Sequence, residues 1–492
     1  MKTPAIAVLD VGKTNKKVTL YDRGFQMLAA ERCAIETRDW NGIEVEDTDR
    51  LLTWFRGALK TLAAEHAIRA VAITAHGATF TLLNEAGELA LPVISYTCAR
   101  GAEVQEEFYE VFGSKEDLHR KTGTPDIGFC NMAKVLYFVK TRLPESWAQC
   151  KHGLFYGPFL GHALTGKRGL EPTFPGNHTY FWDYEAQSWS DVGRQLGADR
   201  LFGEPMSKSW DSLGVVKPEL VVECGLPADC KVTLGIHDSN ANYLPYLAKG
   251  YDDFLLNSTG TWAVMMRSAE APRLSEEEIA AKVFFNQDAF GRPVRTSLIT
   301  LGMDYDTLSR FSALKDRPDV DAARSVVAER QLFVVPGVIE SATAFPGVAP
   351  RVVQGDREHF LDALERDGGT PFTGLGAKYF EALNLGLALA TAKMLANCGI
   401  VEGTTIFIEG GFAKNASYCE FLAALCPQQR FALTNVPEGT SFGAAITGWM
   451  LAEGKALEDI GKEFEIEAIP VKPRDLDGLD AYRAAFEAAC RR

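Results

Sequence analysis

Two short polar turns, one in each half of the chain, contain the residue types that hold phosphate groups. The first turn runs from Asp10 to Lys17 between two apolar segments. In this turn Gly12 lets the backbone approach a ligand, successive backbone N–H groups can form an anion cradle, and Asp10 can hold a hydrated Mg²⁺. The second turn, residues 258–261, has the sequence Ser-Thr-Gly-Thr.

Either turn alone is most simply the end of a β-hairpin. Two such turns at matching points of the chain favour a second interpretation, a pair of opposed hairpins that clamps the phosphates of a nucleotide. Lys13 then either reaches a phosphate as a point charge or is solvated. The residues expected to contact the phosphates are Gly12, Lys13, Thr14, Asn15, Lys17, Thr259, Gly260 and Thr261.

Two segments have part of the spacing of a Walker loop, and neither completes it. Lys13 and Thr14 lack the first glycine of that loop, because Ala7 stands in its place. Residues 161–167 have both glycines, but Arg168 replaces the Ser or Thr whose hydroxyl would bind magnesium. The sequence therefore argues against a Walker-type nucleotide site.

The composition is typical of a globular protein of two or three domains. The 492 residues are 46% hydrophobic and 24% charged. The 51 basic and 65 acidic residues give a net charge of −14, which argues against nucleic acid or an anionic membrane surface as a partner. The ten cysteines form no C-x-x-C pair, and we find no signal region or apolar span long enough to cross a membrane. We therefore expect reduced thiols and a cytoplasmic location.

The elements that must position the two turns follow the same order in both halves. In the first half, strands are predicted at 6–11 and 17–21 on either side of the first turn. Helical spacing over 46–65 then leads to a short buried strand at 70–74, which ends at a histidine and a glycine.

The second half repeats this order. Strands are predicted at 254–257 and 262–266 around the second turn, and a long helix at 376–397 leads to a strand at 405–408. Such a duplication predicts an α/β protein with two domains that face each other across a cleft. The expected domains are residues 1–247 and 248–492.

Taken together, these motifs resemble the FGGY family of carbohydrate kinases, in the actin/Hsp70/hexokinase superfamily, over nearly the whole chain. The two polar turns are similar to the two phosphate motifs of that family. Residues 235–238, Gly-Ile-His-Asp, resemble the segment that carries its catalytic aspartate. Residues 132–138 resemble the first signature of the family, residues 409–415 resemble its adenosine motif, and residues 438–445 resemble its closing helix.

The resemblance implies two duplicated ribonuclease H-like domains of the actin-like ATPase type, and a kinase that uses ATP and Mg²⁺ to phosphorylate a small sugar. The pair His237-Asp238 is most similar to rhamnulose kinases, which favours a ketose such as L-rhamnulose, L-fuculose or xylulose. Three residues depart from the family pattern. Lys13 replaces a small hydroxyl residue, Cys98 replaces an acidic residue on the sugar side, and Phe412 replaces a glycine.

By the same resemblance, Asp238 takes the proton of the sugar hydroxyl, which is a poor nucleophile without a base. An isolated Asp at this position would be a helix N-cap, and Asp238 can serve both roles. His237 either binds a sugar hydroxyl or packs in its loop, and Arg100 either contacts the sugar or pairs with Glu103. The predicted sugar-binding residues are His76, Gly77, Arg100, His237 and Asp238. The predicted metal-binding residues are Asp10 and Asp238. The nucleotide pocket is expected to add Gly302, Gly410, Gly411 and Asn415 to the phosphate-binding residues.

Three classes of function fit these observations. The first is an ATP-dependent kinase for a small sugar, in which closure of the two halves excludes water. The second is a non-catalytic ATP-dependent switch of the actin/Hsp70 type, against which the sequence shows no peptide-binding domain. The third is a sugar-binding regulator that has lost catalysis through Lys13 or Cys98. The expected partners are the sugar and ATP, and a homodimer is one assembly that the sequence allows.

Overall fold

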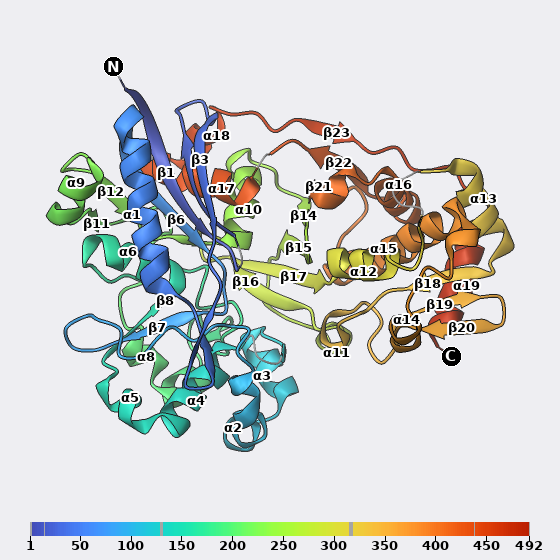
Figure 1. The fold of residues 1–492 in the computed structure, drawn as a ribbon, viewed down its shortest axis with the longest axis horizontal. Coiled ribbons are helices and arrows are strands. Elements are labelled where there is room, and N and C mark those ends of the chain that lie inside the picture. Colours follow the sequence, from blue (N-terminus) through green and yellow to red (C-terminus); the bar gives the residue numbers. More distant parts are fainter. Residues whose placement is uncertain (1, 14, 128–130, 314–317, 437, 492) are drawn as a thin grey trace.

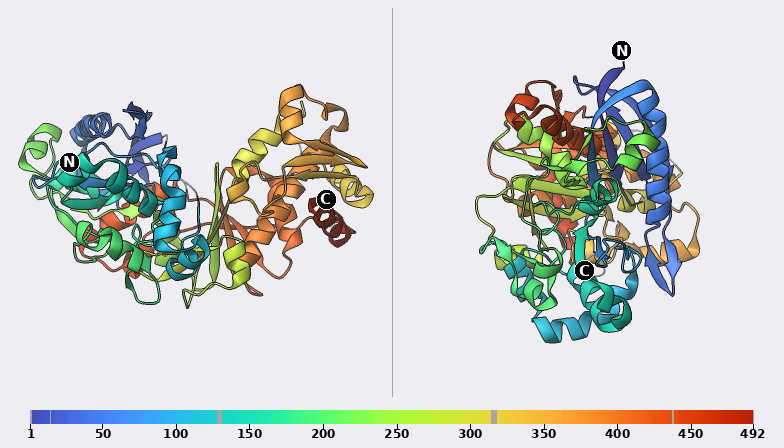
Figure 2. Two further views of the ribbon diagram at one scale, coloured as in Figure 1. Left: turned by 90° about the horizontal axis from the view of Figure 1, so that it is seen from below. Right: turned by 90° about the vertical axis from the view of Figure 1, so that its left-hand side faces the viewer.

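The computed structural model describes residues 2–13, 15–127, 131–313, 318–436 and 438–491. These residues form two halves that lie side by side, each built around a seven-stranded sheet (Figure 1). Seen from below, the two halves diverge from a shared middle region (Figure 2). The arrangement confirms the predicted α/β class with two duplicated domains.

The first sheet begins with an antiparallel meander of three strands, to which β6 adds parallel to β1. β1 is buried along most of its length, which explains its continuous apolar sequence. The order of the sheet is β11-β12-β6-β1-β2-β3, and β13 also pairs with β6. The strands are β1 (Thr3–Val11), β2 (Asn15–Tyr21), β3 (Met27–Ala34), β6 (His66–Ala75), β11 (Ser212–Val215), β12 (Lys231–Thr233) and β13 (Ile236–His237).

The second sheet repeats the hairpin and its parallel neighbour. β14 and β15 form an antiparallel hairpin, and β21 lies parallel to β14 as β6 lies parallel to β1. The order is β16-β17-β15-β14-β21-β22-β23. The strands are β14 (Phe254–Thr259), β15 (Ala263–Ser268), β16 (Phe284–Gln287), β17 (Pro293–Ile299), β21 (Thr405–Gly410), β22 (Arg430–Thr434) and β23 (Ala468–Pro470).

Two helices fill the space between the sheets: α10 (Asp238–Ala248) and α17 (Gly439–Glu453). They pack against each other, and α17 also packs on β1 and β6, although it follows the second sheet in the chain (Figure 1). Ile6 and Ile446 accordingly belong to one apolar core that also contains residues of β14 and β21. The predicted boundary at 247/248 falls in the last turn of α10.

The remaining helices and strands cover the outer faces of the two sheets or extend each half. The predicted long helix is α15 (Ala377–Asn397), and the predicted helix near 46–65 is α1 (Thr48–Glu65). The other helices are α2 (Gln105–Phe112), α3 (Lys115–Thr122), α4 (Met132–Arg142), α5 (Pro144–Gln149), α6 (Tyr156–Thr165), α7 (Asp191–Leu196), α8 (Ala198–Leu201), α9 (Pro218–Cys224), α11 (Glu276–Ala280), α12 (Leu301–Ser309), α13 (Val320–Glu329), α14 (Leu361–Asp367), α16 (Ala416–Leu425), α18 (Leu457–Gly461) and α19 (Leu479–Cys490). Small sheets are formed by β4 (Arg38–Trp40) with β5 (Ile43–Val45), β7 (Phe80–Leu83) with β8 (His152–Phe155), β9 (Trp182–Asp183) with β10 (Ser188–Trp189), and β18 (Leu332–Val335), β19 (Arg351–Gln354) and β20 (Arg357–Phe360) together.

Candidate active site

The first predicted phosphate turn is the tip of the β1–β2 hairpin. Asp10 and Lys17 are partners in register, and the backbone N–H of Gly12 donates to the carbonyl of Asn15 at 3.1 Å. Asp10 is buried, and its Oδ2 accepts a hydrogen bond from Ser441 Oγ at 2.6 Å. Burial raises the pKa of Asp10, although the nearby charge of Lys17 and the hydrogen bond from Ser441 oppose the effect.

Lys17 joins this hairpin to the start of α17. Its Nζ lies 3.2 Å from Asp10 Oδ2 and donates to Glu438 Oε2 at 2.5 Å. Burial lowers the pKa of Lys17, but the two carboxylates outweigh burial and raise it, so the lysine stays charged. Glu438 also accepts from Arg32 Nη2 at 2.9 Å, which joins β3 as well as β2 to the start of α17. The predicted phosphate ligand Thr14 lies outside the described residues.

Lys13 points toward the predicted sugar side of the first half. Its Nζ donates to Glu46 Oε1 at 2.9 Å and to the hydroxyl of Ser95, and it lies over the ring of Tyr96 at 5.1 Å. Glu44 is 3.7 Å away on the same side. In this conformation the ammonium group is bound by protein carboxylates instead of being free to meet a phosphate.

The second predicted phosphate turn is the tip of the β14–β15 hairpin. The backbone N–H of Gly260 donates to the carbonyl of Trp262 at 2.8 Å, and that of Gly302 donates to the carbonyl of Thr261 at 3.1 Å. The hydroxyl of Thr259 faces the parallel strand β21, where it accepts from the backbone N–H of Phe412 at 3.1 Å. Thr259 therefore joins the turn to the glycine-rich end of β21.

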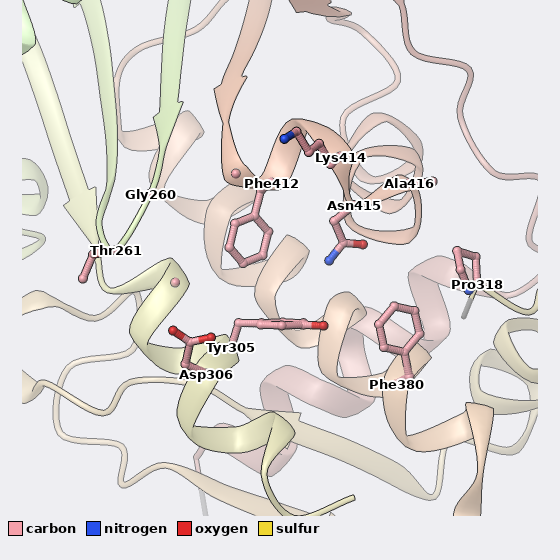
Figure 3. Close-up of a pocket in the computed structure, with 12 residues that line it drawn as sticks. Gly260, Thr261, Tyr305, Asp306, Pro318, Phe380, Phe412, Lys414, Asn415 and Ala416 are labelled. Atoms are coloured by element: carbon pink, nitrogen blue, oxygen red, sulfur yellow. The ribbon is translucent and has the colours of Figure 1, made fainter. Parts of the chain in front are cut away.

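A cavity of about 530 Å³ opens beside this turn. Its walls come from the β14–β15 turn, α12, α15 and the segment that follows β21, and Figure 3 shows the ring of Tyr305 in its middle. Five of the residues predicted to bind the nucleotide line it. The lining consists of Gly260, Thr261, Gly302, Tyr305, Asp306, Pro318, Phe380, Gly411, Phe412, Lys414, Asn415 and Ala416.

Glu409, the residue before the two glycines at the end of β21, is a buried carboxylate that forms no ion pair with the described residues. It accepts hydrogen bonds from the hydroxyl groups of Tyr246 on α10 and Thr434 on β22. Burial raises the pKa of Glu409 to about 7, against these hydrogen bonds. The side chain therefore couples α10, β21 and β22 close to this cavity.

Replacing Glu409 by Gln is expected to stabilise the protein at pH 8 by about 1–3 kcal/mol and to have little effect at pH 4.5. The folded-state pKa of Glu409 lies above its ordinary value of 4.5. Stability from the bound proton is thus present at low pH and is lost as the pH rises toward about 7. Urea midpoints at the two pH values measure the effect, with the exposed Glu402→Gln as control. Equal urea midpoints for Glu409→Gln and wild type at pH 8 would contradict the expected stabilisation.

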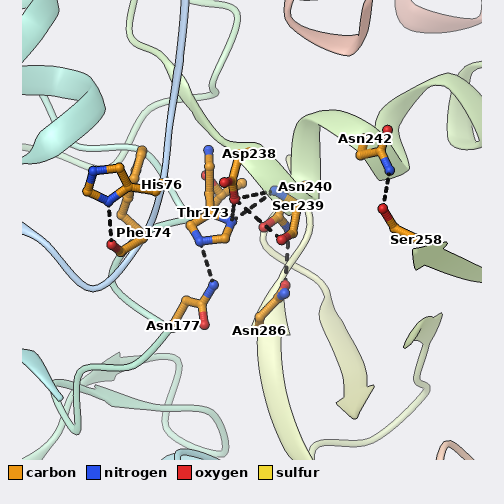
Figure 4. Close-up of polar contacts among 12 residues, drawn as sticks. His76, Thr173, Phe174, Asn177, Asp238, Ser239, Asn240, Asn242, Ser258 and Asn286 are labelled. Carbon is orange, nitrogen blue, oxygen red and sulfur yellow. Dashed lines mark hydrogen bonds and ion pairs between the residues drawn. The ribbon is translucent and has the colours of Figure 1, made fainter. Parts of the chain in front are cut away.

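The predicted base Asp238 stands where β13 ends and α10 begins (Figure 4). Its side chain is 32% exposed, and Oδ1 accepts the backbone N–H of Ser239 at 2.6 Å. Burial raises the pKa of Asp238, and the charge of Asp238 in turn acts to raise the pKa of both Asp10 and His76. The carboxylate is thus close both to the first phosphate hairpin and to His76.

His76 presents an unused nitrogen on this side of the site. The side chain is buried between the rings of Tyr96 and Tyr156, whose centroids lie 5.1 Å and 5.0 Å from its own. Burial lowers the pKa of His76, so the ring is neutral. Nδ1 donates to the carbonyl of Gly77 at 3.0 Å, which leaves Nε2 as a lone-pair acceptor without a partner among the described residues.

The structure connects α10 to the second hairpin as well. Asn242 Nδ2 on α10 donates to Ser258 Oγ at 2.9 Å, as Figure 4 shows. The helix that begins with Asp238 therefore touches the β14–β15 turn through its side chains and carries the carboxylate toward β1. The helix that begins with Asp238 thus contacts the second hairpin through Asn242, while the charge of Asp238 acts on Asp10 of the first.

Other predicted sugar-side residues have protein partners in this conformation. Arg100 pairs with Glu103 and lies over the ring of Phe138 at 5.1 Å. Cys98 is buried in the core of the first half. Both nitrogens of His237 also face protein groups, since Nε2 lies 3.0 Å from the side-chain amide of Asn177 and Nδ1 lies 3.3 Å from Asp238 Oδ1.

Residues 5–244 match the N-terminal domain of the FGGY family of carbohydrate kinases, and residues 252–456 match its C-terminal domain. This chain belongs to the FGGY family. Its two mixed α/β domains accordingly have the actin-like ATPase fold. No helix within the described ranges is long and apolar enough to cross a membrane.

Among individual relatives, an L-fuculokinase of Salmonella typhi is 26% identical over 275 residues, which cover 54% of this chain and 57% of that protein. An L-fuculokinase of Escherichia coli K12 is 25% identical over 58% of its length. The chain thus matches less than two thirds of these curated relatives. A carbohydrate kinase structure from Novosphingobium aromaticivorans superposes with a TM-score of 0.81 at 25% identity, over 100% of this chain and 99% of that one. A xylulose kinase structure from Lactobacillus acidophilus gives 0.80 at 18% identity, over 99% and 97%, and shows the fold alone.

Sequence reasoning did not include several residues that the structure brings to the site. Glu438 and Ser441 reach the first hairpin from α17, a helix more than 400 residues away. Tyr305 and Phe380 line the cavity beside the second hairpin, yet as aromatic residues on helices their sequence pattern is the same as that of core residues. Glu438 and Ser441 both lie within the segment 438–445 that resembles the closing helix, and that resemblance is the one signal that pointed to this group.

Proposed function

We propose that this FGGY-family protein transfers the γ-phosphoryl group of ATP to a hydroxyl of a small sugar. The observation that carries the proposal is Asp238, a partly exposed carboxylate at the start of α10 whose charge acts to raise the pKa of both Asp10 on the first hairpin and His76, whose Nε2 has no partner among the described residues. A phosphoryl acceptor needs a base beside the phosphates and hydrogen-bond partners for its other hydroxyls. Both requirements are met around one side chain.

In the proposed reaction, the sugar oxygen forms a bond to the γ-phosphorus as the bond to the ADP oxygen breaks. Asp238 accepts the proton of the attacking hydroxyl, and the raised pKa of this partly exposed carboxyl suits it to hold that proton. The tips of the two hairpins, where Gly12 and Gly260 let the backbone approach a ligand, surround the phosphates. The adenosine occupies the cavity lined by Gly411 and Asn415.

Mg²⁺ balances the charge of the phosphates in such transfers. The residues present fit a hydrated ion of this kind. Asp10 and Asp238 supply carboxylate oxygens near each other, while no cluster of three or more His, Cys, Asp or Glu side chains that could enclose a metal occurs in the described part of the chain. Mg²⁺ bound largely through phosphates and water needs one or two carboxylates only. We therefore assign Asp10 and Asp238 to it.

For the acceptor we propose a ketose such as L-rhamnulose, L-fuculose or xylulose. Support comes from the His237-Asp238 motif and from relatives that are named L-fuculokinase. His76, Gly77 and Arg100 are the proposed contacts on the sugar side.

A coupled ADP-release assay over ketoses, aldoses and polyols tests this function. We expect turnover with at least one five- or six-carbon ketose and little with glycerol or aldohexoses, because a site of paired polar groups rejects analogues that leave them unpaired. Strong activity on glycerol alone would overturn the ketose assignment. ATP turnover that is independent of every sugar would favour a switch of the actin/Hsp70 type, and ATP binding without turnover would favour a sugar-binding regulator.

A further inference from the structure

A buried ion pair in the second half lies outside the chemistry proposed so far. Arg474 Nη1 is 2.9 Å from Glu381 Oε2, and the two side chains are 5% and 0% exposed. Glu381 belongs to α15, while Arg474 lies between β23 and α19, beyond residues 252–456 that match the family's C-terminal domain. Two buried charges are costly to desolvate, so the arrangement of their partners shows what the pair holds together.

The guanidinium of Arg474 joins α15 to α16. Nε donates to Glu420 Oε2 at 2.8 Å, and Nη2 donates to Ser417 Oγ at 3.3 Å. The backbone N–H of Arg474 also donates to the carbonyl of Glu420 at 3.2 Å, and the guanidinium lies over the ring of Phe421 at 4.8 Å. Each of its three nitrogens therefore has a different oxygen partner, which a single ammonium group could not match.

Glu381 adds a third segment to this network. Its Oε1 accepts the backbone N–H of Asp319, the N-cap of α13, at 2.6 Å. The same oxygen accepts the hydroxyl of Ser417 at 3.1 Å. Both carboxylate oxygens are thus in use, and the start of α13, the second turn of α15 and the start of α16 are joined around one ion pair.

The same three segments form one wall of the cavity beside the second hairpin. Figure 3 shows Phe380, Pro318 and Asn415 on the side of the cavity away from Thr261. Asn415 Nδ2 also donates to Asn384 Oδ1 on α15 at 2.6 Å. Three residues of the network directly follow residues that line the cavity, in the pairs Pro318-Asp319, Phe380-Glu381 and Ala416-Ser417.

We propose that Arg474 is a positioning residue for the adenosine of the nucleotide. Through Glu381 and Ser417 it fixes the three segments relative to one another, and with them the wall against which the adenosine packs. The inference rests on the proposed function for the identity of this ligand. Since Arg474 does not itself line the cavity, it acts on nucleotide affinity and leaves the transfer step to the residues around Asp238.

Titration calorimetry with ADP, in the absence of sugar, tests the proposal. Arg474→Met is expected to raise the Kd for ADP by on the order of 10-fold, because a wall that is no longer held must be ordered on binding. This variant leaves the charge of Glu381 buried without its partner and so destabilises the protein. The double variant Glu381→Gln/Arg474→Met removes both charges, and it carries the test if the single variant does not fold.

The double variant still lacks the guanidinium that holds α15 to Glu420, so we expect it to bind ADP on the order of 10-fold more weakly than wild type. If it binds ADP as tightly as wild type, the ion pair serves stability alone and the proposal is overturned. If wild type itself binds no ADP, the proposed function fails and this inference with it. Wild-type binding with equal affinity in the folded variants overturns this inference only.

Arg351 supplies a matched control. It is also a buried arginine of the second half, and its Nη2 donates to the carbonyl of Ala489 on α19 at 2.6 Å. Arg351→Met should destabilise the protein and leave the Kd for ADP within about 2-fold. With the best sugar, Arg474→Met should raise the KM for ATP and leave kcat and the KM for sugar within about 2-fold. An equal loss of ADP affinity in Arg351→Met, or a fall in kcat at unchanged KM for ATP in Arg474→Met, would overturn the proposal.

Discussion

Asp238→Asn is expected to lower sugar-dependent ADP release by on the order of 10²–10⁴-fold while leaving the KM for ATP nearly unchanged. The amide has the shape of the carboxylate and can still accept the backbone N–H of Ser239, so the start of α10 is preserved. It cannot take a proton from the sugar hydroxyl, however. Initial rates at saturating ATP and sugar measure the loss.

A matched control is available on another helix. Asp191 is the first residue of α7, as Asp238 is of α10, and it lies on the surface of the first half. Asp191→Asn makes the same chemical change at the same helix position and should leave turnover within about 2-fold of wild type. If Asp238→Asn retained turnover similar to Asp191→Asn, Asp238 would be the helix-capping residue of the alternative interpretation and not the base.

The sequence predicted the local parts of this fold well because they depend on local patterns. The predicted strands at 6–11 and 17–21 lie within β1 and β2, and the helix predicted at 376–397 differs from α15 by one residue at its start. These elements combine a clear hydrophobic period with glycine at their ends. The duplicated hairpins then led directly to the two-domain architecture.

The position of α17 could not be predicted in the same way. This helix is nearly apolar on every side, so its sequence shows that it is buried without showing between which elements. Its contacts with β1 and β6 are separated from it by hundreds of residues. Glu438 and Ser441, which bind Lys17 and Asp10, are therefore visible as site residues only once the sheet and the helix are placed together.

Lys13 illustrates a different limit on what the sequence can predict. Its type and its place in the phosphate turn favoured a phosphate contact or a solvated side chain. The structure shows a third arrangement, in which Glu46 and Ser95 bind the ammonium group. Glu46 precedes α1, and nothing in its spacing relative to residue 13 indicates an ion pair. A flexible lysine is directed by whichever carboxylates the fold brings within reach, and that is a property of tertiary structure.

Gly302→Ala is expected to raise the KM for ATP by on the order of 10–10²-fold. Gly302 lies in the first turn of α12, where a Cβ atom would come within 2.3 Å of the carbonyl oxygen of Gly260. Since that atom belongs to the backbone of the β14–β15 turn, no side-chain rotation can relieve the clash, and the turn or the helix must move. Both line the nucleotide cavity. Titration of the initial rate with ATP at saturating sugar measures the change.

The matched control is Gly57→Ala in α1, where an added Cβ meets no atom within 4 Å. Alanine there should leave the KM for ATP unchanged and stabilise the helix slightly, because it replaces glycine in a helix interior.

Gly302→Ala and Asp238→Asn should also differ in the kinetic constant they change, since the first displaces the nucleotide and the second removes the proton acceptor. If Gly302→Ala folds and has the same KM for ATP as Gly57→Ala, the contact between α12 and the hairpin does not contribute to nucleotide binding. A combined variant whose losses multiply would show that the cavity and the base make independent contributions to one reaction.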